Sequence, residues 1–489
     1  MAVMMVLLML SLTLALSYAM LRTQTQVELI QNNFDRQLNA RLAAQAGMAK
    51  ALQAMNEADW DGVTSSVTGS LDSQTTFSAS YATGDSSLTA ASADYAEYPF
   101  RVTITSTGRA VDQNNSAITA TYTIRAVVQL IRKRFYADPS GWSDLQNYTV
   151  MQWNASRSSV VQTPMRITGN VYYRAIPTLF ADYPVGTTPR SRYLTDLNSM
   201  RSAGYGDHRP FAGTVTLPST TTAANQALLS SNLATTLVTH SNTSNNAPVS
   251  HPGNVESYRL YPGGKSYSVP DLYAMYGSTV TGVTLGSSPT TNPLGVYRTT
   301  SAIRLATNTS LSGTLISTNS NAVNLSGSPV TLTGINLPAL HGGTTTYQLP
   351  VTIANYELNV ESTANCTIRG LAMAWDQFEV KPRTASTRLN LTGRVIANDA
   401  DLHGISSWCL DIFWWSWLHS WFLDNYPSYQ YFPVYLRMVH GFNYEPLLTI
   451  QPNSSGVQYH WHTWSQPVYI ADPADGGLRW NLISWTEGD

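Results

Sequence analysis

The sequence predicts an α+β protein with a long N-terminal α-helix, a small antiparallel sheet and a mostly β, solenoid-like C-terminal domain. Three observations support this fold class. No proline or glycine occurs before Gly47, hydrophobic and polar residues alternate through residues 98–131, and an aliphatic–glycine–aliphatic phrase recurs further along. We expect four regions: the helix over 1–60, the small sheet over 61–135, the solenoid over 136–407 and an aromatic-rich cap over 408–489.

The composition limits the classes of function that the chain can have. The 489 residues include 28 basic and 30 acidic side chains, for a net charge of −2. This balance does not favour a nucleic-acid partner, because such partners usually require a basic surface. Charged residues make up only 12% of the chain, which is a weak sign of an exported β-rich protein. Two cysteines, Cys366 and Cys409, exclude a disulfide framework but allow one bridge.

The first 21 residues contain no charge before Arg22 and are long enough to enter or cross a bilayer as a helix. One interpretation is a secretory signal peptide cleaved after Ser17-Tyr18-Ala19, although the basic region that such peptides need is missing. A second is a plain N-terminal anchor. A third is that this segment is the first half of a longer helix, which the following residues support.

From Val27 onward, hydrophobic residues recur mostly in steps of three and four, the period of one helical face, and charged residues lie between them. One helix therefore runs from Met1 to about Met55, near 80 Å at about 1.5 Å per residue. Its first half is apolar all round and its second half is amphipathic. The side chains expected in an apolar helix interface are Met1, Met5, Leu8, Leu12, Leu16, Val27, Ile30, Phe34, Leu38 and Leu42.

This helix resembles the N-terminal segment of type IV pilin-like subunits, particularly PilX-type minor pilins and K-type pseudopilins. The resemblance rests on Arg22, Thr23, Asn32, Arg36 and the small-residue run Ala43-Ala44-Gln45-Ala46-Gly47. It is strong over about 60 residues and loose to about residue 135. It implies that a prepilin peptidase removes a leader, that the inner membrane holds the subunit before assembly, and that pilus assembly machinery builds copies into a helical filament.

One position departs from the family pattern. Most pilins carry a glutamate at mature position five that pairs with a neighbour's N-terminal amine, whereas this chain has Met5. The K-type pseudopilins also lack this glutamate. The departure favours a minor or initiating subunit, or an unusual filament.

The sequence of the next region, residues 61–135, predicts a small globular head that follows the helix. Residues 61–95 are rich in Ser, Thr, Ala and Gly and are expected to form a surface loop. Alternation at Val102 and Ile104, and again from Ile118 to Val127, predicts antiparallel strands separated by a turn. A helix covered by a small antiparallel sheet matches the expected pilin-like head, although such a hairpin also occurs in other α+β domains.

The long C-terminal region predicts a β-solenoid over about 150–405, with irregular insertions near 185–300. A solenoid coil needs a short buried strand, a bend and another strand, and glycine allows the bend. A β-sandwich is the alternative. The phrases that carry the prediction are Ile167-Thr168-Gly169, Leu311-Ser312-Gly313, Ile368-Arg369-Gly370 and Leu391-Thr392-Gly393, together with the segment 323–337.

An aromatic-rich segment follows. We expect it to cap the open end of the solenoid or to form a subunit interface, in preference to a sugar-binding platform. A disulfide between Cys366 and Cys409 would tie it to the solenoid in an oxidising compartment. The aromatic residues assigned to this cap or interface are Trp408, Trp414, Trp415, Trp417 and Trp421.

Catalytic signals are weak. His460 and His462 share one strand face but have no carboxylate or cysteine at matching spacing, so we expect no metal. Asp399 and Asp401 are interpreted as turn residues. No phosphate-binding loop or nucleophile elbow is present. We therefore expect a structural filament subunit without catalytic residues or cofactors. The alternatives are an anchored protein that binds or cleaves surface polysaccharide, or a minor pseudopilin of a type II-like secretion system.

Overall fold

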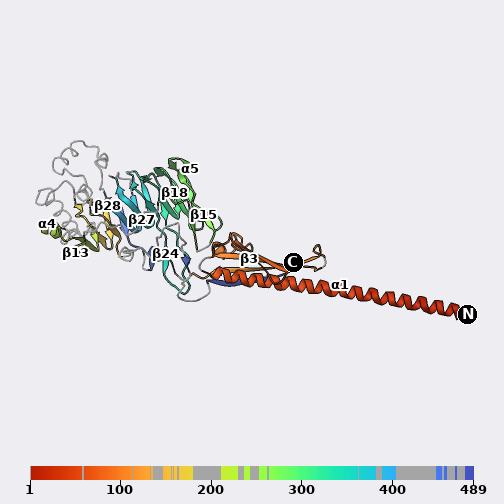
Figure 1. Cartoon of the computed structure of the whole chain (residues 1–489). Helices are drawn as coiled ribbons and strands as arrows, with labels where there is room; N and C mark the ends of the chain where they lie inside the picture. The colour runs from red at the N-terminus through yellow and green to blue at the C-terminus, as the bar shows by residue number, and fades with distance from the viewer. Residues whose placement is uncertain are drawn as a thin grey trace. The chain divides into compact units, whose positions relative to one another are not determined.

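The computed structural model describes most of the chain and divides it into two compact units (Figure 1). The head unit comprises residues 1–134, 259–265 and 469–489, and the solenoid unit comprises 135–258 and 266–468. The residues described are 2–57, 60–113, 115–132, 134–135, 147–155, 157, 159–161, 165–179, 211–228, 236–242, 253–261, 264–361, 363–381, 388–402, 448–453, 456–459, 469–470 and 479–488.

The predicted fold class is confirmed. A single helix, α1 (Ala2–Asn56), begins the head unit, and its red N-terminal half extends far beyond the strands that follow (Figure 1). The absence of proline and glycine before Gly47 explains why the helix is unbroken over 55 residues.

The head sheet has five antiparallel strands in the order β1-β2-β3-β4-β32. A short 3₁₀ helix, η1 (Tyr95–Phe100), precedes β3. The prediction of a surface loop over 61–95 is wrong, because two strands form there. Their serine- and threonine-rich outer faces hid the pattern, whereas Phe77, Ala79 and Tyr81 alternate on the buried face. The strands are β1 (Ser66–Ser70), β2 (Thr75–Thr83), β3 (Arg101–Val111), β4 (Thr119–Leu130) and β32 (Trp480–Glu487).

The last strand corrects the predicted cap over 408–489. β32 pairs with β4, so the chain returns to the head sheet at its end, and the solenoid unit is inserted between two neighbouring head strands. Residues 448–451 also leave the predicted cap, because they form a coil strand of the solenoid.

The solenoid unit is built from short parallel strands stacked as coils. Two short helices, α4 (Ala223–Leu228) and α5 (Leu272–Tyr276), accompany them. The coil strands are β6 (Val150–Gln152), β7 (Val160–Val161), β8 (Met165–Thr168), β9 (Val171–Tyr172), β10 (Thr178–Leu179), β11 (Phe211–Ala212), β12 (Thr214–Pro218), β13 (Thr236–His240), β16 (Thr279–Val280), β17 (Thr284–Leu285), β18 (Val296–Thr299), β19 (Ile303–Leu305), β20 (Thr309–Ser312), β21 (Thr314–Ser317), β22 (Val323–Leu325), β23 (Val330–Thr333), β25 (Thr352–Ala354), β26 (Glu357–Val360), β27 (Asn365–Val380), β28 (Arg388–Leu402) and β29 (Leu448–Gln451).

Further short strands lie outside the coils. They are β5 (Arg134–Phe135), β14 (Ser257–Arg259), β15 (Ser266–Ser268), β24 (Thr346–Gln348) and β31 (Tyr469–Ile470), and β24 pairs with β30 (Val457–Tyr459). The expectation of irregular insertions near 185–300 is wrong for the coil strands β11, β12, β13, β16, β17 and β18, which lie within that range. These strands are only two to five residues long and rich in threonine, so their periodicity is weak in the sequence.

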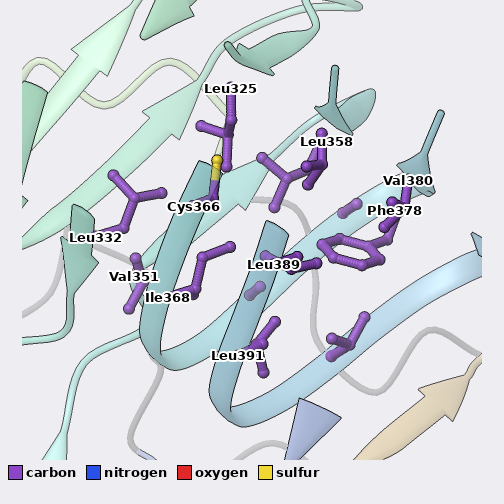
Figure 2. Packing of buried hydrophobic residues seen from close by; sticks show 14 of the residues in the cluster. Leu325, Leu332, Val351, Leu358, Cys366, Ile368, Phe378, Val380, Leu389 and Leu391 are labelled. Carbon is purple, nitrogen blue, oxygen red and sulfur yellow. The ribbon is translucent and has the colours of Figure 1, made fainter. Parts of the chain in front are cut away.

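One column of buried side chains shows how the coils stack. Hydrophobic residues, most of them two positions before a glycine bend, lie in register with their counterparts on the next coil, and Leu332, Ile368 and Leu391 point into one interior in Figure 2. Burying this column on every coil is what stabilises strands too short to be stable alone. The column runs Leu285, Leu311, Leu332, Ile368, Leu391, Ile450, Ile167 and Phe211.

The order of this column differs from the order of the sequence. Residues 150–240 form coils that lead from the middle of the stack to one of its ends. Residues 279–402 form coils that begin at the opposite end and lead back to the coil of residues 150–152. The two runs meet at a junction where β28 pairs with β6 and β7, and β29 lies between β28 and β8. The solenoid is therefore permuted relative to a simple sequential winding.

Candidate functional site: the exposed face of helix α1

The C-terminal half of α1 docks on the head sheet through small side chains. The helix packs on β2, β3 and β4. A β-carbon added at Gly108 would lie 2.0 Å from the Ala40 carbonyl oxygen, and one at Gly47 would lie 2.5 Å from Ser106 Oγ. These close approaches require glycine on both surfaces. The buried face consists of Ala40, Ala43, Ala44, Gly47, Met48, Ala51 and Met55.

Side-chain donors from the sheet fix the docked half of the helix. Ser106 Oγ donates to the Ala44 carbonyl at 2.8 Å, Tyr81 Oη to the Ala51 carbonyl at 3.0 Å, and Trp480 Nε1 to the Met55 carbonyl at 3.1 Å. Burial raises the pKa of the Tyr81 phenol to about 12, and the protonated phenol is the donor to the Ala51 carbonyl. Trp480 belongs to β32, so the chain's last strand helps to hold the helix.

Ion pairs border the docked half. Arg36 pairs with Asp112, and Arg41 Nη2 lies 2.5 Å from Glu487 Oε2 on β32. The pKa of Glu487 is lowered, first by the hydrogen bond from the Trp485 indole and then by those from Arg41 and Gln45. These contacts set the rotation of the helix about its axis.

The N-terminal half of α1 contacts nothing else in the described chain. The helix is long and apolar enough to cross a membrane, with an 18-residue window of mean hydropathy 2.2 that is entirely unburied. All but one of the predicted interface side chains are described, and each is exposed: Met5 72%, Leu8 66%, Leu12 59%, Leu16 56%, Val27 54%, Ile30 70%, Phe34 65%, Leu38 44% and Leu42 47%. Met1 lies outside the described residues.

The amphipathic half therefore has two distinct faces. Val27, Ile30, Phe34, Leu38 and Leu42 form a stripe of large hydrophobic side chains, which we call the open stripe. At about 100° per residue, the centre of this stripe lies roughly 120° around the helix from the centre of the docked face. The head thus covers the small-residue face and leaves the open stripe in solvent.

The sequence interpretation found the open stripe but missed the docked face. It assigned the helix a single apolar face, whereas a second face that includes Met48 is buried against the sheet. The available signal was the run Ala43-Ala44-Gln45-Ala46-Gly47, whose small side chains permit close helix–sheet packing.

Other predicted residues are not brought together. Cys366 is fully buried in the solenoid interior, where burial raises the pKa of its thiol to about 12, but Cys409 lies outside the described residues, so their bridge stays a prediction. His460, His462 and the five tryptophans assigned to the cap also lie outside the described residues: Trp408, Trp414, Trp415, Trp417 and Trp421. Among the residues that the structure describes, no three His, Cys, Asp or Glu side chains cluster as metal ligands.

No family model and no curated protein matches the sequence. Among solved structures, the chain is similar to the crystal structure of the competence-associated pilin ComZ from Thermus thermophilus, at 12% identity and a TM-score of 0.21, covering 93% of this chain and 98% of that chain.

Proposed function

We propose that this chain is a structural subunit of a type IV pilus-like extracellular filament. Its α1 helices pack against copies of themselves in the filament core, and the solenoid unit is displayed outside. The observation that carries the proposal is the continuous exposed helix surface from Ala2 through the open stripe, on a helix whose other face the head already covers.

Apolar burial supplies the driving force. Burying one Leu-sized side chain contributes about 1.5–3 kcal/mol, and association costs about 4–15 kcal/mol in lost freedom of motion. The exposed side chains from Val3 to Leu42 are numerous enough to exceed that cost even when each is buried only in part. A helix that is apolar over its first half is equally compatible with a bilayer, so the inner membrane is the proposed location before assembly.

The proposed partners follow from the resemblance of the N-terminal segment. A prepilin peptidase removes a leader, and pilus assembly machinery drives extrusion. The protein's role is structural rather than catalytic. A filament-building subunit is our proposal, with a minor pilin or pseudopilin as the second candidate.

Leu8→Glu tests this role. An unpaired charge in an apolar helix bundle costs several kcal/mol, so we expect loss of filaments from sheared surface material. Ser11→Thr, which keeps the segment uncharged, is the matched control and should leave filament yield unchanged. Membrane fractions are assayed in parallel to separate failed assembly from failed insertion. Normal filaments from Leu8→Glu, with the variant protein along their length, would contradict core packing.

A further inference from the structure

A polar cluster lies on the solenoid where the two winding runs meet. β27 bulges between Ala374 and Gln377, so that Trp375 and Asp376 face Asn398 on β28. Bulges redirect side chains and are frequent beside functional sites. We call the surrounding group the Tyr356 cluster; it comprises Tyr356, Glu357, Asp376, Asn398, Asp399 and Arg157.

The charges of the cluster are unequal. Arg157 Nη1 lies 2.7 Å from Asp376 Oδ1 and 3.8 Å from Asp399 Oδ2, so one guanidinium faces two carboxylates. Glu357 adds a third carboxylate, and its hydrogen bond and charge raise the pKa of the Tyr356 phenol. Three acids against one base leave the cluster with excess negative charge, which opposes anionic ligands.

Two buried amides have acceptor atoms without a donor. Asn398 is 7% exposed, and its Nδ2 donates to Asp376 Oδ1 at 3.3 Å. Asn359, 3% exposed, donates to Glu357 Oε2 at 3.1 Å and to Asn324 Oδ1 at 3.1 Å. Within the described residues, neither Asn398 Oδ1 nor Asn359 Oδ1 has a hydrogen-bond partner. Buried acceptors are normally satisfied, so Asn398 Oδ1 is an acceptor of the cluster for which a bound molecule could supply the donor.

Aromatic groups accompany these acceptors. The rings of Trp153 and Trp375 lie 5.0 Å apart at 42°, and Tyr356 is 37% exposed. Flat apolar rings beside a few converging polar groups are the general composition of a small-molecule site. The Arg157 side chain, 48% exposed, supplies donors at the rim of the cluster.

We propose that the Tyr356 cluster binds a polyhydroxylated, non-anionic ligand, namely a neutral or amino sugar unit of a surface polysaccharide. Sugar hydroxyls supply donors to the carboxylates and to Asn398 Oδ1, and the indole ring of Trp375 packs on the apolar face of the sugar ring. The negative charge disfavours uronic acids. This inference concerns the solenoid unit and does not depend on filament formation.

The test measures binding to the full chain in detergent by isothermal titration calorimetry. The probes are hexamers of glucose (β-1,4), N-acetylglucosamine, glucosamine and galacturonate, with spermidine as an amine without hydroxyls. We expect a Kd of about 1 mM or tighter for at least one of the first three hexamers and no binding of the galacturonate hexamer.

Tyr356→Phe removes one hydroxyl and should weaken binding roughly threefold to tenfold. Tyr276→Phe is the matched control, since Tyr276 is 38% exposed on α5, which lies at the end coil of the solenoid and away from the cluster, and it should bind as the wild type does. Asp376→Asn should weaken binding further, with a melting curve recorded to confirm folding.

Three results would overturn the proposal. One is that no uncharged or amino-sugar hexamer binds. Another is that Tyr356→Phe and Tyr276→Phe bind equally well. The third is that spermidine and the glucosamine hexamer bind alike while the neutral hexamers do not, because the cluster would then be a simple cation site.

Discussion

At Gly393 a single added methyl group would collide with the neighbouring coil. A β-carbon there would lie 1.9 Å from the Gly370 carbonyl oxygen, and the backbone φ of 149° is one that other residues rarely adopt. Gly313 meets Gly295 in the same way, at 2.0 Å. The recurring glycine of the sequence phrase is therefore a requirement of coil-to-coil spacing as well as of the bend.

We expect Gly393→Ala to lower the free energy of unfolding of the solenoid by about 2–4 kcal/mol, through strain and displacement of the adjacent strand. Gly286→Ala is the control, because nothing lies within 4 Å of the place that its β-carbon would take and its backbone is not left-handed; its effect should stay within about 1 kcal/mol. Chemical denaturation followed by circular dichroism measures both. Equal stability of the two variants would contradict the role assigned to Gly393.

Glu487 is one of the residues through which pH acts on the stability of the head. Its pKa is lower in the folded chain than its ordinary value of 4.5, so its contribution to stability is present above that value and is lost as the pH falls through the folded pKa. We expect the protection of the β32 amides, after division by the intrinsic exchange rate at each pH, to fall below about pH 4.5, and Glu487→Gln to remove that fall. If the variant and the wild type show the same acid dependence, Glu487 does not hold β32 to the helix.

At the scale of the element, one face of α1 packs on the head sheet and another face, the open stripe, is proposed to pack on neighbouring subunits. The sequence pattern predicted its length and its open stripe, because periodicity and the absence of helix breakers are local signals. It did not predict which face the head would cover, because alanine and glycine carry little hydrophobic signal and their value lies in close packing against Gly108.

The open stripe should be needed for assembly but not for folding of the head. Phe34→Glu places a charge on the stripe, where Phe34 is 65% exposed, and should abolish filaments while leaving the melting temperature of the detergent-solubilised protein unchanged. Asn39→Glu adds the same charge to an exposed position off the stripe and should assemble normally. Filament counts by negative-stain electron microscopy compare them. Loss of filaments in both variants would point to charge alone and contradict a specific stripe.

At the scale of the whole molecule, the permuted winding brings together the two chain ends of the solenoid unit, as its insertion between two paired strands requires. The chain leaves the head sheet after β4 and returns to it as β32. Leu130 of β4 is paired with Trp480 of β32. A sequentially wound solenoid of eight stacked strands would separate its two chain ends by roughly 34 Å. Here β6 and β29 both pair with β28, so the ends lie in one coil.

The sequence could not predict this winding order. The aliphatic–glycine phrase is the same in both runs, so it identifies coils without ordering them, and one coil carries Pro452 where most others carry glycine. The Tyr356 cluster was missed for a related reason. Its carboxylates and Asn398 come from successive coils of one run, the junction adds Arg157, and the sequence pattern indicated Asp399 only as a turn residue.

A disulfide tests the junction. Met151 and Ile396 are neighbours on parallel strands about 4.8 Å apart, within the range that a disulfide spans. In a Cys409→Ser background, Met151→Cys with Ile396→Cys should form an intramolecular bond, seen as a monomer of altered mobility on a non-reducing gel, and the single variants should not. A ladder of cross-linked oligomers would contradict a junction formed within one chain.

The central claim is that copies of this chain build the body of a filament. We would label sheared surface fibres with an antibody raised against residues 300–489 and count gold particles along each fibre by electron microscopy. The account predicts label along the whole length of the fibres, with the solenoid unit accessible outside. Label confined to fibre tips or to membranes would contradict it and would favour a minor subunit.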